Sequence, residues 1–294
     1  MNTTDTMLRR IVSRTSGNSH GPVTRLMSPG DLGEQLKPFI FLDIFSIADA
    51  RQMPFGMHPH SGIATVTVLT EGDAAFDDGE GNLGTLAYGG VEWMRSGRGI
   101  WHGKEIGAGS SRGFTGFQLW LALPEELELS LAESQYLEAK HIPQVGPARL
   151  VVGRYGGEQS PVRAPDGINY LLVTLQPGER WIYETPEGHM SGWFAVAEGE
   201  VMMGERVAAG EMAVLDESDG AIELQSTGTV PAKLVIGTAA RHPHDLHMGY
   251  YSVHTSQSSL AEGEAHIQKL RLKLIERERQ AGTRVAGEPV PVLR

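Results

Sequence analysis

The second half of this 294-residue sequence repeats the order of strand-like segments in the first half. Residues 71–73, Glu-Gly-Asp, are echoed 127 residues later by Glu-Gly-Glu at 198–200. Residues 90–94 are echoed 120 residues later by residues 210–214, so the hairpin between the two segments is shorter in the second copy. Two similar β units in one chain predict duplicated barrels that stack face to face.

The length and composition agree with two β domains. A chain of 294 residues exceeds the usual size of one hydrophobic core. The 37 glycines and 16 prolines favour short strands joined by turns. We therefore predict an all-β fold with one domain at 1–140 and a second at 141–294, joined through a charged, proline-bearing segment at 124–147.

Hydrophobic periodicity places the elements along the chain. Strand-like runs occupy 38–45, 63–69, 89–94 and 114–123, and the Gly- and Asn-rich residues 77–82 predict a hairpin loop. After the second unit, apolar residues three or four apart between 256 and 280 predict an amphipathic helix. It should begin near Ser258 or Ser259 and end at Gly282, with a tail to residue 294.

The charge and composition exclude several classes of function. The net charge of −11 disfavours direct binding of nucleic acid. The absence of cysteine removes disulfides, thiolate metal sites and cysteine nucleophiles, which leaves histidine and carboxylate as strong metal ligands. No apolar run has the length of a membrane span or a signal peptide. We expect a cytoplasmic protein that does not bind membranes.

Three histidines in the first unit form a candidate metal site. His58 and His60 are two apart on a strand-like segment, so their side chains point to the same face. His102, which follows a Gly-Arg-Gly turn, can arrive from a later strand and close a facial set around one ion. The corresponding positions of the second unit, 185, 187 and 222, hold Thr, Glu and Ile, so only the first barrel should carry a metal. His189 stands alone and is predicted to be an exposed loop residue.

These motifs together resemble the pirin family of bicupins. The matching segments are FGMHPHSG at 55–62, TVTVLTEG at 65–72 and GVEWMRSGRGIWH at 90–102, and the similarity returns at 243–255. The resemblance implies two stacked cupin barrels with one iron-class metal in the first, held by three histidines that correspond to His58, His60 and His102. It also implies either quercetin 2,3-dioxygenase activity on a flavonol or similar enolic aromatic substrate, or a non-catalytic, metal-binding or redox-sensing role through protein–protein contacts.

The fourth family ligand, a glutamate, does not carry over directly. Its position is Lys104 here, and Glu105 follows one residue later; the other usual cupin carboxylate position is Ala64. A one-residue shift turns a side chain to the opposite face of a strand unless a bulge at Gly103 corrects it. Three alternatives follow: Glu105 as fourth ligand or near neighbour, three histidines completed by water, and no metal.

The expected chemistry uses one divalent metal ion per chain, with Fe(II) first and Zn, Ni, Cu or Mn as alternatives. Glu105 is the candidate catalytic base for the proton of a metal-bound substrate hydroxyl. Candidate pocket walls, which could equally be ordinary core, are Phe55, Met57, Trp93, Met94 and Trp101.

Two further features remain open on sequence grounds. Arg98 and Lys104 flank His102 and could attract an anionic ligand or be solvated surface charge. His242, His244 and His247 form a short histidine-rich run without strand geometry, whose role is open: a loop, a second ligand group, or a contact to substrate if the loop folds back to the first barrel. We expect a monomer, with a protein partner as the alternative to a small aromatic substrate.

Overall fold

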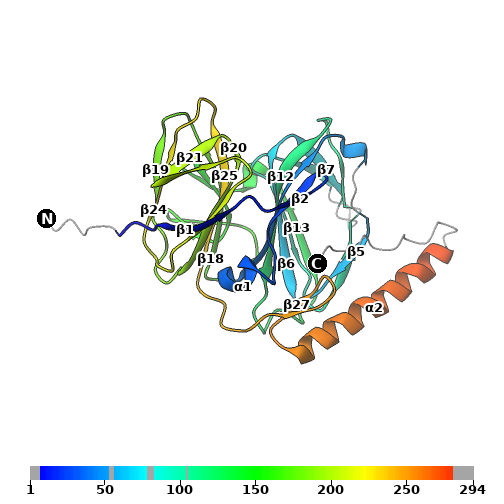
Figure 1. Ribbon diagram of the computed structural model, residues 1–294. Helices are drawn as coiled ribbons and strands as arrows, with labels where there is room; N and C mark the ends of the chain where they lie inside the picture. The colour runs from blue at the N-terminus through cyan, green and yellow to red at the C-terminus, as the bar shows by residue number, and fades with distance from the viewer. Residues whose placement is uncertain (1–6, 53–55, 78–82, 104, 281–294) are drawn as a thin grey trace.

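Two seven-stranded antiparallel sheets face each other in the computed structural model (Figure 1). The structure describes residues 7–52, 56–77, 83–103 and 105–280. The predicted all-β architecture with one C-terminal helix is confirmed. The predicted hairpin loop at 77–82 and the tail after residue 280 lie almost wholly outside the described residues.

The first sheet has the order β13-β9-β6-β12-β4-β3-β2. Its strands are β13 (Glu133–Leu137), β9 (Val91–Arg95), β6 (Ile63–Glu71), β12 (Phe114–Ala122), β4 (Phe39–Ile47), β3 (Val23–Met27) and β2 (Asn18–His20). Two smaller sheets close this barrel: β5 (His58–His60) with β10 (Ile100–His102), and β7 (Asp73–Asp77) with β8 (Leu83–Ala87) and β11 (Ile106–Ala108).

The second sheet has the order β1-β23-β20-β25-β18-β15-β14. Its strands are β1 (Ile11–Thr15), β23 (Met212–Leu215), β20 (Ser191–Glu198), β25 (Ala232–Ala239), β18 (Ile168–Leu175), β15 (Ala148–Val152) and β14 (Gln144–Val145). It is closed by β19 (Arg180–Tyr183), β24 (Ile222–Ser226), β21 (Glu200–Met203) and β22 (Glu205–Ala208), with a short hairpin of β16 (Arg154–Tyr155) and β17 (Glu158–Gln159) beside it.

The strand orders show the duplication. β9-β6-β12-β4-β3 in the first sheet corresponds to β23-β20-β25-β18-β15 in the second. The N-terminal strand β1 pairs with β23, so the start of the chain contributes to the second sheet. The boundary at residue 140 stays a prediction; β13 ends at Leu137 and β14 begins at Gln144.

One apolar core lies between the two barrels. Alternate residues of each large sheet point into it, because successive side chains of a strand face opposite ways. Trp93 and Phe117 from the first sheet and Tyr170 and Trp193 from the second are fully buried there. Phe39 contacts Trp193 edge to face, with ring centroids 5.4 Å apart. The remaining inward residues of each sheet face the interior of their own barrel.

After the second barrel the chain returns to the first. A hairpin of β26 (His247–Met248) and β27 (Val253–His254) leads into helix α2 (Gln257–Gln280), which lies beside the first barrel (Figure 1). The helix begins one residue before the predicted start. The remaining helical elements are α1 (Leu32–Leu36) and the 3₁₀ turns Ala50–Gln52 and Ala139–His141.

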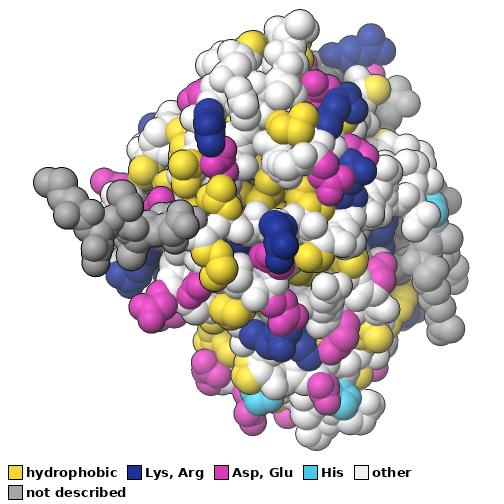
Figure 2. Space-filling model, turned by 60° about the vertical axis from the view of Figure 1, so that its left-hand side comes forward, with side chains coloured by type: hydrophobic (Ala, Val, Ile, Leu, Met, Phe, Trp, Pro, Cys, Tyr) yellow, Lys and Arg dark blue, Asp and Glu magenta, His cyan; other side chains and the backbone are white. Residues whose placement is uncertain are grey.

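The surface carries charges of both signs. On the face shown in Figure 2, basic side chains are interspersed with acidic ones rather than gathered into one patch. Ion pairs of the described residues include Lys233 with Glu198 at 2.7 Å and Arg206 with Glu200 at 2.6 Å. Among the described residues, the longest helix, α2, is too polar to cross a bilayer, and the other helical elements are too short.

Candidate metal centre

The three predicted histidines converge at one end of the first barrel. β5 and β10 pair antiparallel, which places His102 directly opposite His58 and Ile100 opposite His60. One ring nitrogen from each histidine lies within 4.8 Å of the corresponding nitrogens of the other two. The ring centroids are 4.3 to 5.1 Å apart. This arrangement could hold one metal ion, and among the described residues it is the one such group.

Glycines shape the turns that bring His102 to this position. Gly99 and Gly103 have φ of +148° and +125°, in the range that residues with a Cβ avoid. A Cβ on Gly103 would lie 2.6 Å from the carbonyl oxygen of Gly56. A Cβ on Gly99 would lie 2.6 Å from Cγ2 of Ile267 on α2. The strand pair therefore depends on glycine at both ends of β10.

Hydrogen bonds fix the direction of two of the rings. Nδ1 of His58 lies 2.8 Å from the carbonyl oxygen of Gly56, and Nδ1 of His60 lies 3.1 Å from that of Tyr251. A carbonyl oxygen can only accept, so Nδ1 carries the proton and Nε2 presents its lone pair. The Nε2 atoms of His60 and His102 are buried and have no hydrogen-bond partner in the described part of the chain. A divalent cation would satisfy these orphaned acceptors, so the residues present fit a metal.

Burial also keeps the imidazoles neutral. It lowers the pKa of His102 to about 3, and it lowers the pKa of His60 well below its usual value. The pKa of His58 is lowered by burial as well, although the hydrogen bond to Gly56 and the charge of Glu105 oppose this shift. Only a neutral imidazole binds a metal, so no proton has to be displaced from the rings at neutral pH.

Glu105 lies close to His58 but is not a member of the three-histidine group. Its Oε2 accepts a hydrogen bond of 2.7 Å from the backbone N–H of Gly103. The carboxylate is close enough to His58 to raise the pKa of that ring. The sequence predicts that Glu105 faces the site only if the backbone is irregular at Gly103. The positive φ of Gly103 is such an irregularity. Lys104 lies outside the described residues.

Tyr251 is a site residue that the sequence did not single out for a role. It lies 191 residues from His60 along the chain, and its ring centroid is 5.6 Å from that of His58 and 5.8 Å from that of His60. Its φ of +58° places it in the left-handed region, where non-glycine residues are uncommon. The positive φ lies in the turn of the β26–β27 hairpin, which also aims the Tyr251 carbonyl at His60.

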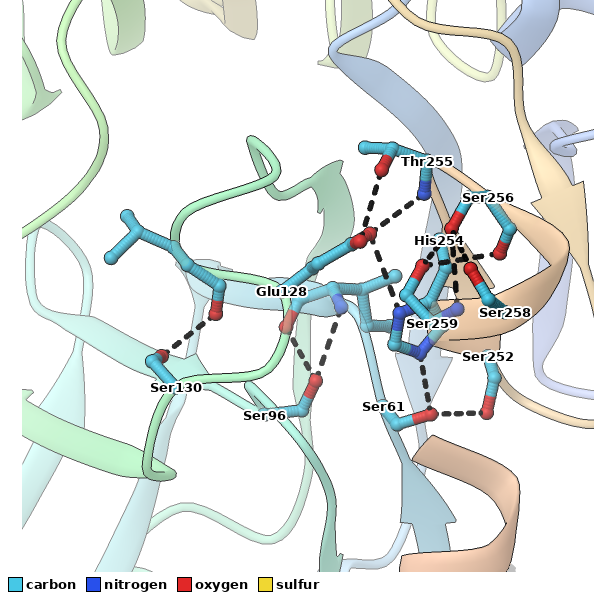
Figure 3. Close-up of polar contacts among 12 residues, drawn as sticks. Ser61, Ser96, Glu128, Ser130, Ser252, His254, Thr255, Ser256, Ser258 and Ser259 are labelled. Atoms are coloured by element: carbon cyan, nitrogen blue, oxygen red, sulfur yellow. Dashed lines mark hydrogen bonds and ion pairs between the residues drawn. The ribbon is translucent and has the colours of Figure 1, made fainter. Parts of the chain in front are cut away.

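A buried polar network holds this hairpin against the first barrel (Figure 3). Ser61 donates a hydrogen bond of 2.8 Å to Ser252, and its Oγ lies 3.0 Å from Nε2 of His254. Nδ1 of His254 lies 3.4 Å from Oε2 of Glu128, which accepts a hydrogen bond from the N–H of Thr255. A serine, a histidine and a carboxylate in this order resemble a hydrolase triad, but all three are at most 2% exposed. Because no substrate can reach them, the network is structural.

The proposed wall residues have different positions. Trp93 lies in the core between the barrels, so of its two alternatives the ordinary-core position is the one the structure shows. Met94 is on the opposite face of β9, and the indole N–H of Trp101 donates to Ile267 of α2 at 2.9 Å. Trp120 was missed: its ring lies 4.8 Å from that of His60 and stacks on Phe41 at 4.0 Å. Phe55 lies outside the described residues.

The second histidine run forms no comparable group. His242 is buried and its ring centroid is 5.6 Å from that of His244, while His247 pairs with His254 in the β26–β27 hairpin. Burial lowers the pKa of His242 to about 4. Among the described residues these three histidines do not join a set of three potential ligands. The segment after this histidine run does lead back to the first barrel, where the carbonyl oxygen of Tyr251 contacts His60.

In the second barrel, polar side chains hydrogen-bond to each other at the corresponding end. Tyr183, the last residue of β19, pairs with Ile222, the first of β24, as His60, the last residue of β5, pairs with Ile100, the first of β10. The hydroxyl of Tyr183 lies 3.0 Å from that of Thr238 and accepts a hydrogen bond of 2.8 Å from Asn169. His189 is buried with Nδ1 3.1 Å from the Thr238 hydroxyl, so the prediction of an exposed loop histidine was wrong.

Comparison with known proteins places this architecture among the cupin proteins with two barrels. The family model described as Pirin matches residues 22–121. A Pseudomonas aeruginosa protein named "Putative quercetin 2,3-dioxygenase" is 30% identical over 237 residues, which cover 76% of this chain and 82% of the relative. A pirin-like protein of Caulobacter vibrioides is 35% identical over 199 residues, 64% of this chain and 70% of the relative. The chain belongs to the pirin family.

Solved structures agree on the fold. A quercetin 2,3-dioxygenase from Acinetobacter baumannii superposes with a TM-score of 0.77 and 24% identity, over 90% of this chain and 98% of that one. A bacterial pirin of Escherichia coli in complex with nickel(II) gives a TM-score of 0.56 and 18% identity, over 80% and 99% of the two chains. The protein is therefore a bicupin, with the three-histidine group in its first barrel.

Proposed function

We propose that this protein is a metal-dependent dioxygenase of the quercetin 2,3-dioxygenase type, acting on a flavonol or a similar enolic aromatic compound. The observation that carries the proposal is the convergence of three neutral imidazoles, two of which have a buried Nε2 atom without a hydrogen-bond partner in the described part of the chain. The name of the Pseudomonas aeruginosa relative supports it independently. We further propose Fe(II) as the native metal, because three imidazoles with a nearby carboxylate suit this ion.

The residues divide into ligands and a proton acceptor. His58, His60 and His102 would hold the ion, and Glu105 would complete its surroundings as fourth ligand or neighbour. A bound divalent ion supplies Lewis acidity, which lowers the pKa of a substrate hydroxyl placed against it. Glu105 then accepts the proton of that hydroxyl, and the Gly103 N–H holds its carboxylate in position. Trp120 and Tyr251 provide aromatic walls that restrict water beside the histidines.

The test is reconstitution of the metal-free protein under anaerobic conditions. Fe(II), Ni(II), Cu(II), Mn(II) or Zn(II) is added separately, and loss of quercetin is followed spectroscopically after air is admitted. We expect turnover with Fe(II) that is absent in the His58→Ala variant. If no metal gives turnover above that control while metal analysis shows one bound ion per chain, the dioxygenase proposal is wrong. The protein would then be a metal-binding pirin that acts without this chemistry.

A further inference from the structure

A row of polar side chains crosses the inner face of the first sheet. Strand pairing places each member directly opposite the next, because all the strands concerned are in register at this level. In order from β13 to β3, the row consists of Tyr136, Glu92, Thr67, Gln118, Asp43 and Arg25. We call these six residues the polar row.

The polar row faces the barrel interior rather than the second barrel. Residues on either side of its members along the chain lie in the core between the barrels, among them Val66, Trp93, Phe117 and Leu119. Side chains alternate along a strand, so the row points the other way. Trp120 lies two residues beyond Gln118 on β12, so it points to the same side as the row. The ring of Trp120 contacts His60. The row and the histidines therefore share one interior.

That interior admits solvent. Gln118 lies on β12, a central strand that is paired on both sides, and its neighbours Phe117 and Leu119 are fully buried. The side chain of Gln118 is nevertheless only half-buried, so the surface it exposes opens into the barrel. Beside the row, the Thr65 hydroxyl and the Trp120 indole N–H are buried without a hydrogen-bond partner among the described residues. Both atoms are able to bind a polar ligand.

The polar row is partly satisfied at its two ends. Arg25 donates two hydrogen bonds to Asp43, one of them at 3.1 Å, and its guanidinium lies 3.9 Å from the ring centroid of Phe41. At the other end the Tyr136 hydroxyl donates to Glu92 at 3.4 Å. Burial raises the pKa of Glu92 to about 7, so this carboxyl group is costly to bury in its charged form. Groups that are costly to bury and only partly paired are typical of a binding site.

We propose that the polar row is the specificity-determining surface of the proposed site, at which Thr67 and Gln118 hydrogen-bond to the ring hydroxyls of the substrate. This inference rests on the proposed function and deepens it. Positions on adjacent strands are about 4.8 Å apart, a spacing that two meta-related hydroxyls of one ring can match. Gln118 and Thr67 each offer a donor and an acceptor, and the flanking carboxyl groups accept from phenolic hydroxyls.

Equilibrium binding without turnover tests the row. The protein is loaded with Zn(II), which has no redox chemistry, and titrated anaerobically with quercetin and with 3-hydroxyflavone, which lacks the additional ring hydroxyls. The variants Thr67→Val and Gln118→Met remove hydrogen-bonding groups at nearly constant volume. Thr115→Val, on the other face of β12, is the matched control. Calorimetry gives Kd for each pair.

We expect the wild type and Thr115→Val to bind quercetin at least about 10-fold more tightly than 3-hydroxyflavone. Each row variant should weaken quercetin roughly 2- to 10-fold, the value of one or two hydrogen bonds, and leave 3-hydroxyflavone unchanged within about 2-fold. Equal affinity of the wild type for both compounds, or equal weakening of both by the row variants, overturns the inference alone. Failure of both compounds to bind the wild type overturns the proposed function together with it.

Discussion

The two barrels have the same strand order, but their interiors differ in polarity. In the second barrel, Arg14 of β1 occupies the position of Tyr136, and the positions that correspond to the other five residues of the polar row hold apolar side chains. From β23 to β15 they are Ala213, Phe194, Ile236, Leu171 and Leu150, all fully buried in one cluster. The same backbone architecture therefore accommodates either polar or apolar side chains in the barrel interior. Side-chain choice at these five aligned positions decides whether the barrel interior is a packed apolar core or carries polar groups.

The ends of the barrels differ in the same sense. In the second barrel Tyr183, Asn169, Thr238 and His189 hydrogen-bond to one another, so these polar groups are satisfied within the protein. In the first barrel the buried Nε2 atoms of His60 and His102 have no such partner among the residues that the structure describes. Unpaired buried polar atoms cost stability, and a bound ligand can recover that cost. This difference supports the proposal that the first barrel holds the functional site.

Removal of one metal ligand should give the largest effect. His60→Ala eliminates a buried donor from the three-histidine group, and we expect bound metal to fall from about one ion per chain to nearly none. His244→Ala removes a half-buried histidine outside the group and should leave the metal content unchanged. Elemental analysis of both purified variants is the measurement. Retention of a full ion by His60→Ala would contradict the assignment of the metal to this barrel.

Truncation at equivalent row positions should expose the difference in packing. Phe194→Ala in the second barrel removes a fully buried ring, and we expect a loss of about 3–5 kcal/mol in the free energy of unfolding. Thr67→Ala at the corresponding position of the first barrel should cost about 1 kcal/mol, because it removes little apolar volume. Urea unfolding of both variants measures this. Equal losses would mean that the two interiors are packed alike.

The buried carboxyl of Glu92 should make stability depend on pH. Its pKa is raised by burial from 4.5 to about 7, so the fold favours the protonated form. The associated stability is fully present below pH 4.5 and is lost as the pH rises through 7, by up to about 3 kcal/mol. In the metal-free protein, Glu92→Gln should therefore gain stability relative to wild type over this range.

Glu71→Gln, exposed at the end of β6, is the control for that measurement. Its free energy of unfolding should follow the wild-type pH profile. The comparison uses chemical unfolding at closely spaced pH values between 4 and 8. The difference in free energy of unfolding between Glu92→Gln and wild type should change over this interval. A constant difference would show that the pKa of Glu92 is not raised, which would contradict the interpretation of the first interior as one with costly buried polar groups.

Loosening of the hairpin that carries Tyr251 should have the smallest effect. Ser252→Ala removes the acceptor of the Ser61 hydrogen bond in the buried network, and we expect to lose about 1 kcal/mol of stability. The affinity for metal should fall a few-fold, because the Tyr251 carbonyl orients His60. Ser258→Ala, exposed on α2, should change neither quantity. Competition with a metal chelator gives the affinities, and an unchanged affinity in Ser252→Ala would limit the hairpin to a structural role.

Local patterns predicted the parts of the site that depend on local geometry. The same-face arrangement of His58 and His60 follows from the two-residue period of a strand, and the need for an irregularity at Gly103 follows from the position of Glu105. Prediction failed for residues whose surroundings come from distant segments. His189 was placed on the surface because its neighbours in sequence are turn residues, but Thr238 and Arg9 bury it.

The sequence by itself determined that the chain forms two β units, that the first carries three histidines of suitable spacing, and that the second lacks them. These features depend on composition and on short periodicities, which are local properties of the chain. Only the tertiary structure decided that Tyr251 reaches His60 from 191 residues away and that the polar row aligns across six strands. Strand register and the return path of the chain set these contacts, and both result from packing of the whole molecule.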